Sequence, residues 1–243
     1  VYPAVVEGRM QWIVDGFTTS ANYPNSRLIE LAEATSDSVA QRSNVVTVGT
    51  GQVNYVRNAV KATVDAYTGD VKLYGWDTKD PMLKAWEKAF PDSVRPLSEI
   101  SGELMAHIRY PQDFLKVQRE LLTEYHVTNP GDFYSGSDKW RVPRDPAVAN
   151  QDQPVVFQSI AMPGEAEAAF SITTPFVPAS NNEAGREILR GLLAVDADAG
   201  DQAGCRPLNR RAKQHRDEAN CHEKRRLHVG TPNCLHGKLF VRF

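Results

Sequence analysis

Strict alternation of apolar and polar residues across residues 60–76 most constrains what this chain can fold into. One alternating run covers residues 60–67, a second covers residues 71–76, and Thr68-Gly69-Asp70 separates them. A side-chain period of two is that of a β-strand, because successive side chains point to opposite faces. Two such runs joined by turn-forming residues predict an antiparallel hairpin. A second hairpin is predicted around Glu7-Gly8, with alternation over residues 10–15.

Helical spacing replaces alternation in the middle of the chain. Asp80 followed by Pro81 is typical of a helix start, and Pro91 ends that helix. Ser98 is the predicted cap of a second helix that extends to Ile108, and a third covers residues 111–125. Polar loops are expected at residues 18–26 and 28–44, the latter with one helical turn. Strands are expected at residues 155–160, 168–173 and 189–195. We therefore expect an α+β fold, mostly antiparallel sheet with a central group of helices.

The chain changes character near Gly200. Residues 201–243 hold 10 of the 28 Lys and Arg residues but 4 of the 30 Asp and Glu residues, a net charge of +6 against -8 for residues 1–200. All three cysteines lie there, and both periodicities fade. We expect residues 1–200 to be a fragment of an α+β domain, and residues 201–243 to be a disordered or poorly packed basic tail.

Three interpretations of this tail remain open. A zinc site would use Cys205, Cys221, His222, Cys234 and His236, but the paired spacing that zinc sites usually show is absent. A basic arm for nucleic acid would lack a helical basic stripe. Translation of the gene out of register would explain the abrupt enrichment in Cys, His and Arg, and we favour it. No metal, cofactor or nucleic-acid partner is therefore expected.

Short motifs in residues 1–200 offer little recognisable chemistry. Gly49-Thr50-Gly51-Gln52 lacks the remainder of a phosphate loop or a dinucleotide turn, so a turn is predicted. Ser135-Gly136-Ser137-Asp138 contains no nucleophile elbow and is predicted to be a turn that caps a short element. Four acidic residues near one hairpin could offer paired carboxylates or a calcium site, but they do not fit the EF-hand spacing and we favour solvated residues at hairpin ends: Asp65, Asp70, Asp77 and Asp80.

The segment Glu103–Asp113 is the best candidate for a functional site. It brings His107, Arg109 and Tyr110 to a junction between helices, where a histidine could titrate near neutral pH and an arginine could hold an anion. The structural alternative, which we favour, is that Arg109 pairs with Asp113 while His107 lies at a helix end. No catalytic residue is assigned.

Several long segments resemble the uncharacterised protein family 0182. The segments that carry the resemblance are Gln11–Pro24, Asn54–Tyr67, Glu103–Asp113, Tyr134–Asp138 and Phe170–Pro178. The resemblance covers residues 1 to about 199. It implies a large bacterial multi-pass membrane protein, of which this chain would be part of the soluble extracytoplasmic region. The family has no established activity, cofactor or catalytic residue, so no functional residue is carried over.

The expected function follows from this resemblance and stays open. No apolar run approaches the roughly 18–20 residues that cross a bilayer, and the chain starts without Met or a leader sequence. We expect an extracytoplasmic segment at the cell membrane, with a role in envelope interaction or transport and with the membrane-embedded part of the full-length protein as its partner. One alternative is an extracytoplasmic hydrolase in which Asp15, Asp65, His107 or Arg109 converge in a cleft. The other is a metal- or nucleic-acid-binding protein that acts through its tail. Whether the chain is an enzyme is undecided, and we lean towards no.

Overall fold

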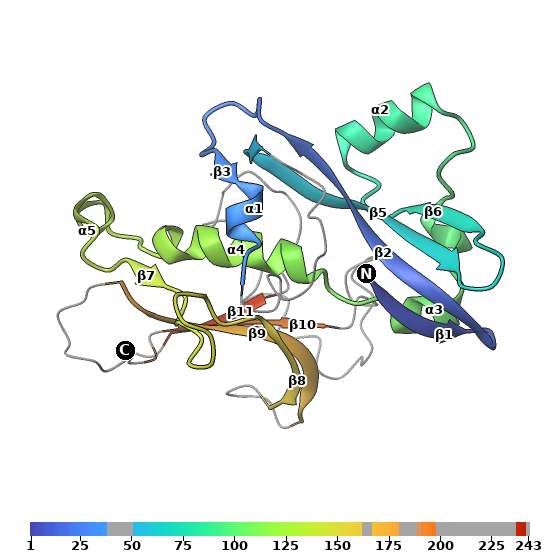
Figure 1. Ribbon diagram of the computed structural model, residues 1–243. Helices are drawn as coiled ribbons and strands as arrows, with labels where there is room; N and C mark the ends of the chain where they lie inside the picture. The colour runs from blue at the N-terminus through green and yellow to red at the C-terminus, as the bar shows by residue number, and fades with distance from the viewer. Residues whose placement is uncertain (38–50, 162–166, 180–188, 190, 198–236, 242–243) are drawn as a thin grey trace. The chain divides into compact units, whose positions relative to one another are not determined.

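Two compact units make up the part of the chain that the computed structural model describes: residues 1–37, 51–161, 167–179, 189, 191–197 and 237–241 (Figure 1). Unit 1 contains Val1–Leu28 and Gln52–Pro111, and unit 2 contains the other described residues. Each unit combines helices with a sheet of antiparallel strands. The predicted α+β class, with mostly antiparallel sheet, is therefore confirmed.

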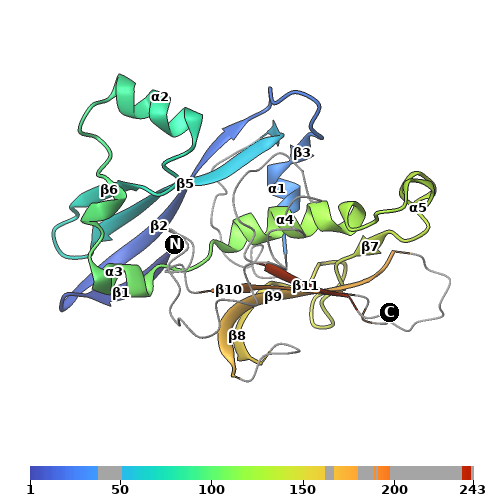
Figure 2. The same cartoon turned by 180° about the vertical axis from the view of Figure 1, so that it is seen from behind.

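Unit 1 is built on a four-stranded sheet in the order β1-β2-β5-β6, which Figure 2 shows from behind. The strands are β1 (Tyr2–Val6), β2 (Arg9–Ser20), β5 (Tyr55–Asp65) and β6 (Val71–Gly75), and the short β4 (Gln52–Val53) precedes β5. Both predicted hairpins are present. Glu7 and Gly8 join β1 to β2 with φ angles of 52° and 73°, the left-handed geometry of the tight turns that match the twist of paired strands.

Two local predictions in unit 1 need correction. Strand β2 continues to Ser20, so the predicted loop starts too early; Thr18, Thr19 and Ser20 pair with β5 beyond a bulge at Gly16 and Phe17. The helix expected from Ser98 is broken into a 3-10 turn, η1 (Leu97–Glu99), and the helix α3 (Gly102–His107). Ser101 is the residue that caps α3, because its Oγ accepts a hydrogen bond from the Leu104 amide at 3.2 Å.

The helices of unit 1 follow β6 along the chain; α3 shares a core with one face of the sheet, whereas Leu83 and Glu87 of α2 (Pro81–Ala89) lie beside Gly75 on the other face. Helix α2 starts as predicted, with the Asp80 carboxylate accepting from the Leu83 amide at 2.9 Å. The buried cluster combines side chains of the sheet, η1 and α3: Val6, Ile13, Tyr74, Trp76, Ile100, Leu104 and Ile108. The face of the sheet that carries Val6 and Ile13 is called the inner face below, and the opposite face is called the outer face.

Unit 2 holds the second sheet, in the order β11-β10-β9-β7, with β8 paired to β9. Its strands are β7 (Trp140–Arg141), β8 (Val156–Ile160), β9 (Ala169–Pro178), β10 (Gly191–Asp196) and β11 (Gly237–Val241), and the two-residue β3 (Ile29–Glu30) precedes α1. Its helices are α1 (Leu31–Ala34), α4 (Gln112–Tyr125) and α5 (Pro130–Ser135), of which α4 contacts α1, β7 and β9. The strands expected at residues 155–160, 168–173 and 189–195 and the third helix are all present.

The predicted basic tail falls almost entirely outside the described residues. Residues 201–236, which include all the candidate zinc ligands and most of the basic side chains of the tail, lie outside the described residues. Residues 237–241 are described, and they form β11, which pairs antiparallel with β10.

Candidate functional site

The inner face of β5 carries polar and charged side chains instead of the usual apolar row. Four of the five inward positions are polar or charged, namely Tyr55, Arg57, Lys61 and Thr63; the fifth is Ala59, and all five are buried. Lys61 is the extreme case, with only 1% of its surface exposed. Because an unpaired buried charge is costly, the positions of the neighbouring acids decide whether this arrangement is stable.

Lys61 lies at the centre of a polar cluster in unit 1. Its ammonium group forms an ion pair with Asp15, lies 3.4 Å from the Arg109 carbonyl oxygen, and is 5.1 Å from the centre of the Trp76 ring. Burial lowers the pKa of Lys61, while the carboxylate of Asp15 acts in the opposite direction. An amine with a lowered pKa can act as a nucleophile, but reaction requires access that a side chain exposed by 1% lacks.

The predicted junction site contributes to this cluster through its backbone. The Arg109 amide donates a hydrogen bond of 2.7 Å to the Tyr2 hydroxyl, and the Arg109 guanidinium lies 5.2 Å from the centre of the Tyr2 ring. Burial raises the pKa of Tyr2. His107 is exposed at the end of α3, where Nδ1 lies 2.8 Å from the Glu103 carbonyl oxygen. Asp15 and Arg109 are thus brought to one neighbourhood, whereas the His107 ring contacts the Glu103 carbonyl of its own helix.

The four acidic residues near the second hairpin have separate partners. Asp65 pairs with Arg9 at 2.8 Å, Asp70 accepts from the Thr68 hydroxyl at 2.9 Å, and Asp77 pairs with Arg57 at 2.5 Å. Asp80 has its own set of donors. In the described part of the chain, no group of three or more His, Cys, Asp or Glu side chains is arranged to hold a metal ion.

Asp80 anchors α2 to the sheet. Its fully buried carboxylate accepts hydrogen bonds from the Thr18 hydroxyl at 2.8 Å, from the Tyr55 hydroxyl, and from the Leu83 amide. Burial alone would raise the pKa of Asp80, but these hydrogen bonds outweigh burial and lower it. The pKa of Tyr55 rises to about 12, first because the hydroxyl is buried and then because it donates to this carboxylate. The arrangement holds a helix start in place.

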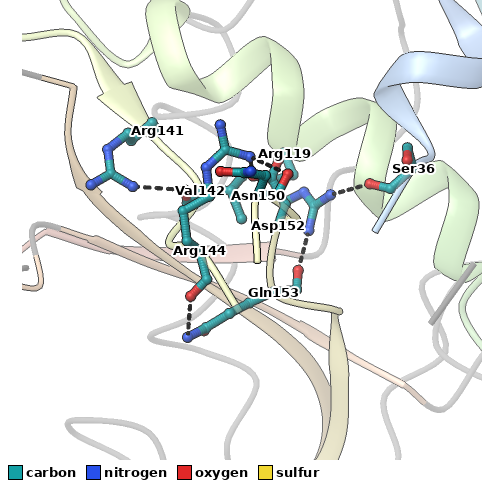
Figure 3. Close-up of polar contacts among 8 residues, drawn as sticks. All are labelled: Ser36, Arg119, Arg141, Val142, Arg144, Asn150, Asp152 and Gln153. Atoms are coloured by element: carbon teal, nitrogen blue, oxygen red, sulfur yellow. Dashed lines mark hydrogen bonds and ion pairs between the residues drawn. The ribbon is translucent and has the colours of Figure 1, made fainter. Parts of the chain in front are cut away.

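A second polar cluster lies in unit 2, around Arg119 on α4. Figure 3 shows its guanidinium reaching two backbone carbonyls, that of Gln153 at 3.0 Å and that of Ser36 at 3.5 Å. Arg144 extends the cluster by donating to Asp152 at 2.9 Å and to the Asn150 carbonyl at 3.3 Å. Burial lowers the pKa of Arg119, which is 2% exposed. The cluster fastens two irregular segments to one helix.

Lys116, one turn before Arg119, does the same for the segment after α1. Its ammonium lies 2.8 Å from the buried carboxylate of Asp37 and donates to the Thr35 carbonyl at 3.1 Å. Asp113, the acid predicted to pair with Arg109, lies 3.5 Å from Lys116 on the same helix. The buried charges of Lys116 and Arg119 thus hold chain segments together.

The two remaining sequence motifs are simple to place. Gly136 ends α5 with a φ of 66°, so the predicted turn at residues 135–138 does close a short helix. Residues 49 and 50 of the glycine-rich motif lie outside the described residues, whereas Gly51 has a φ of 138° and Gln52 starts β4.

The outer face of the unit 1 sheet is the feature that the sequence motifs miss. Cross-strand neighbours identify its rows: Val5 with Met10, Pro3 with Trp12 and Val64, Val14 with Ala62 and Leu73, and Gly16 with Val60 and Gly75; Val71 completes the second row. All twelve positions are apolar or glycine. Several of these side chains are exposed: Val5 (57%), Met10 (44%), Trp12 (43%) and Val71 (60%). A contiguous, partly exposed apolar face of this kind is a candidate contact surface.

By its fold, the chain is an α+β protein segment in which buried charges hold helices, strands and loops together and the unit 1 sheet has a partly exposed apolar face. The chain belongs to the uncharacterised protein family UPF0182, which matches residues 1–213 and so extends past residue 200. It is similar to UPF0182 proteins of Arthrobacter sp. (52% identity, 84% of this chain), Kineococcus radiotolerans (53%, 84%) and Streptomyces coelicolor (54%, 82%).

Length separates this chain from these relatives. The matched segment covers 20%, 21% and 20% of the three relatives, so the chain spans about a fifth of their length. No solved structure matches the chain. Among the described helices, none combines the length and apolar character that a membrane span needs.

Proposed function

We propose that this chain is an extracytoplasmic segment of a large bacterial cell-membrane protein and that its role is envelope interaction, in support of transport or of envelope structure, rather than catalysis. The resemblance to a family of large membrane proteins supports the location. The single observation that carries the interaction role is the apolar outer face of the unit 1 sheet.

The buried charges support the same interpretation. Lys61, Asp80 and Arg119 are each held by partners within the fold, at 0–2% exposure. Groups in such positions stabilise a scaffold, whereas a catalytic group must reach its substrate. The twelve strand positions of the outer face, by contrast, offer contact area and none of them carries a titratable side chain.

Two measurements in the bacterium that encodes the protein test this function. Tyr67 is 80% exposed in the turn between β5 and β6, so a Tyr67→Cys variant should react with a membrane-impermeant maleimide in intact cells. Reaction only after permeabilisation would contradict the extracytoplasmic location. The unmodified protein, which retains its own cysteines, is the control, and the peptide that carries residue 67 is the one analysed.

The second measurement separates interaction from catalysis. A strain lacking the gene is complemented with either Trp12→Lys or the double variant His107→Ala/Arg109→Ala, and its resistance to detergent is compared with the wild type. We expect Trp12→Lys to fail and the double variant to succeed, because the former places a charge on the outer face and the latter alters exposed side chains at the junction. The opposite pattern would favour the hydrolytic alternative.

A further inference from the structure

The unit 1 sheet is inverted relative to an ordinary surface sheet. Its inner face carries the charged and polar side chains Asp15, Arg57, Lys61 and Thr63 of β2 and β5, whereas its outer face is apolar in the cross-strand rows from Val5–Met10 to Gly16–Val60–Gly75. Arg57 and Lys61 pair with acidic side chains, and Lys61 also lies over the Trp76 ring. A sheet with the opposite face buried would leave these charges without their partners. A sheet with this pattern is a middle layer, because its apolar side requires a cover of its own.

The size of the outer face argues for the kind of cover. Four strands about 4.8 Å apart, with a rise of about 3.3 Å per residue from Met10 to Gly16, give a face of roughly 19 Å by 23 Å. Because Leu83 and Glu87 of α2 already cover the corner at Gly75, burying the rest would remove at most roughly 800–900 Å² from both layers together, below the ~1,200–2,000 Å² that separate proteins need for a stable complex. That area lies inside the range of roughly 600–1,500 Å² for interfaces between domains of one chain. A neighbour within the same polypeptide is therefore favoured over a second copy.

The relatives leave ample chain for such a neighbour, since about four fifths of each lies outside the matched segment. We propose that the outer face of the unit 1 sheet packs against an uncharged, apolar layer formed by another part of the same long UPF0182 polypeptide. This proposal rests on the interaction role proposed above and names its partner. The contact is intramolecular, so the chain forms one layer of a larger folded region.

Thiol protection in the gene product measures this contact. Val71→Cys places a thiol on the outer face, and Tyr67→Cys places a matched thiol in the adjacent turn, outside that face. Both positions lie in one tryptic peptide, residues 62–72, so the maleimide reaction is compared on the same fragment. The rate at each position in a native, non-denaturing extract is divided by the rate in urea. Val5→Cys, at the opposite edge of the sheet, is a second outer-face variant.

The expected result is at least ~10-fold protection of Val71→Cys and Val5→Cys in a product much larger than 27.0 kDa, with Tyr67→Cys reacting freely. Equal reaction at all three positions would overturn the proposal. Protection in a product of 27.0 kDa would overturn it as well, because the cover would then be a separate molecule. In that case, a dimer in sedimentation velocity that Trp12→Lys dissociates would identify a second copy. This experiment uses an extract and does not depend on where the protein lies in the cell. Loss of the packing proposal would therefore be distinguishable from loss of the proposed extracytoplasmic location.

Discussion

Replacing Lys61 with methionine is the most direct test of the charged inner face. Methionine keeps most of the apolar stem of the side chain, one atom shorter, but removes the cation that pairs with Asp15. The Asp15 side chain is 13% exposed, so its carboxylate would remain largely buried without a counter-charge. The perturbation therefore unpairs a charge and changes little of the packing around Trp76.

The magnitude follows from burial. Breaking a buried ion pair by removing one partner costs about 3–5 kcal/mol, and the partial exposure of Asp15 places Lys61→Met near the lower end, about 3 kcal/mol. Such a loss lowers the ratio of folded to unfolded protein by more than ~100-fold. The double variant Lys61→Met/Asp15→Val removes both charges, so its stability should lie within ~1 kcal/mol of the wild type.

Urea unfolding followed by tryptophan fluorescence is the assay, because Trp76 borders Lys61. The four proteins form a double-mutant cycle: wild type, each single variant and the double variant. If Lys61→Met alone is too unstable to fold, recovery of folding in the double variant still tests the pair. A loss below ~1 kcal/mol for Lys61→Met, or no recovery in the double variant, would refute the buried pairing.

The same lysine predicts a pH dependence. Because burial lowers the pKa of Lys61 in the folded state below its ordinary 10.5, the unfolded chain holds the proton at pH values where the folded chain has released it. The free energy of unfolding should therefore gain a contribution that rises with pH as pH 10.5 is approached from below. This contribution should be absent in Lys61→Met and larger in Asp15→Val, which lacks the carboxylate that favours the charged amine.

Three further predictions concern other polar contacts. Asp80→Ala should cost about 2–3 kcal/mol in urea unfolding, because it removes the cap of α2 and the acceptor of the buried Tyr55 hydroxyl. Asp80→Asn keeps an acceptor oxygen and should cost less; equal losses in the two variants would contradict the role of that acceptor. The Asp65 carboxyl should titrate in NMR with a pKa of about 2, because it accepts hydrogen bonds from the Thr68 amide and then from Arg9. Arg9→Ala should raise that pKa towards 3.8, and an unchanged pKa would show that Arg9 has no effect. Arg119→Lys should destabilise unit 2 by about 1–2 kcal/mol, because an ammonium group replaces the guanidinium that donates to the carbonyls of Ser36 and Gln153. The exposed control Arg95→Lys should cost less than ~0.5 kcal/mol. Similar losses in the two variants would contradict a special role of the Arg119 guanidinium.

The elements of this fold could be predicted wherever their causes are local. The hairpin turn at Glu7-Gly8, the Asp80-Pro81 helix start and the Gly136 helix end depend on backbone preferences of a few adjacent residues, and all three are present. Local rules fail where two candidates compete. Ser98 and Ser101 are both acceptable caps, and the 3-10 turn at Leu97–Glu99 leaves the capping role to Ser101. Strand β2 continues beyond the end of its alternating sequence pattern, because pairing with β5 extends it across a bulge.

By itself, the sequence determined the family, the α+β class and the two hairpins, because long matched segments and a side-chain period of two require no knowledge of distant contacts. Alternation says that two faces differ but not which of them is buried. Only the tertiary structure decided that the row with Lys61 turns inwards, because its counter-charge, Asp15, lies 46 residues away. The apolar outer face is the consequence, since burying the charges with their partners leaves the valines of β5 to meet whatever covers the sheet.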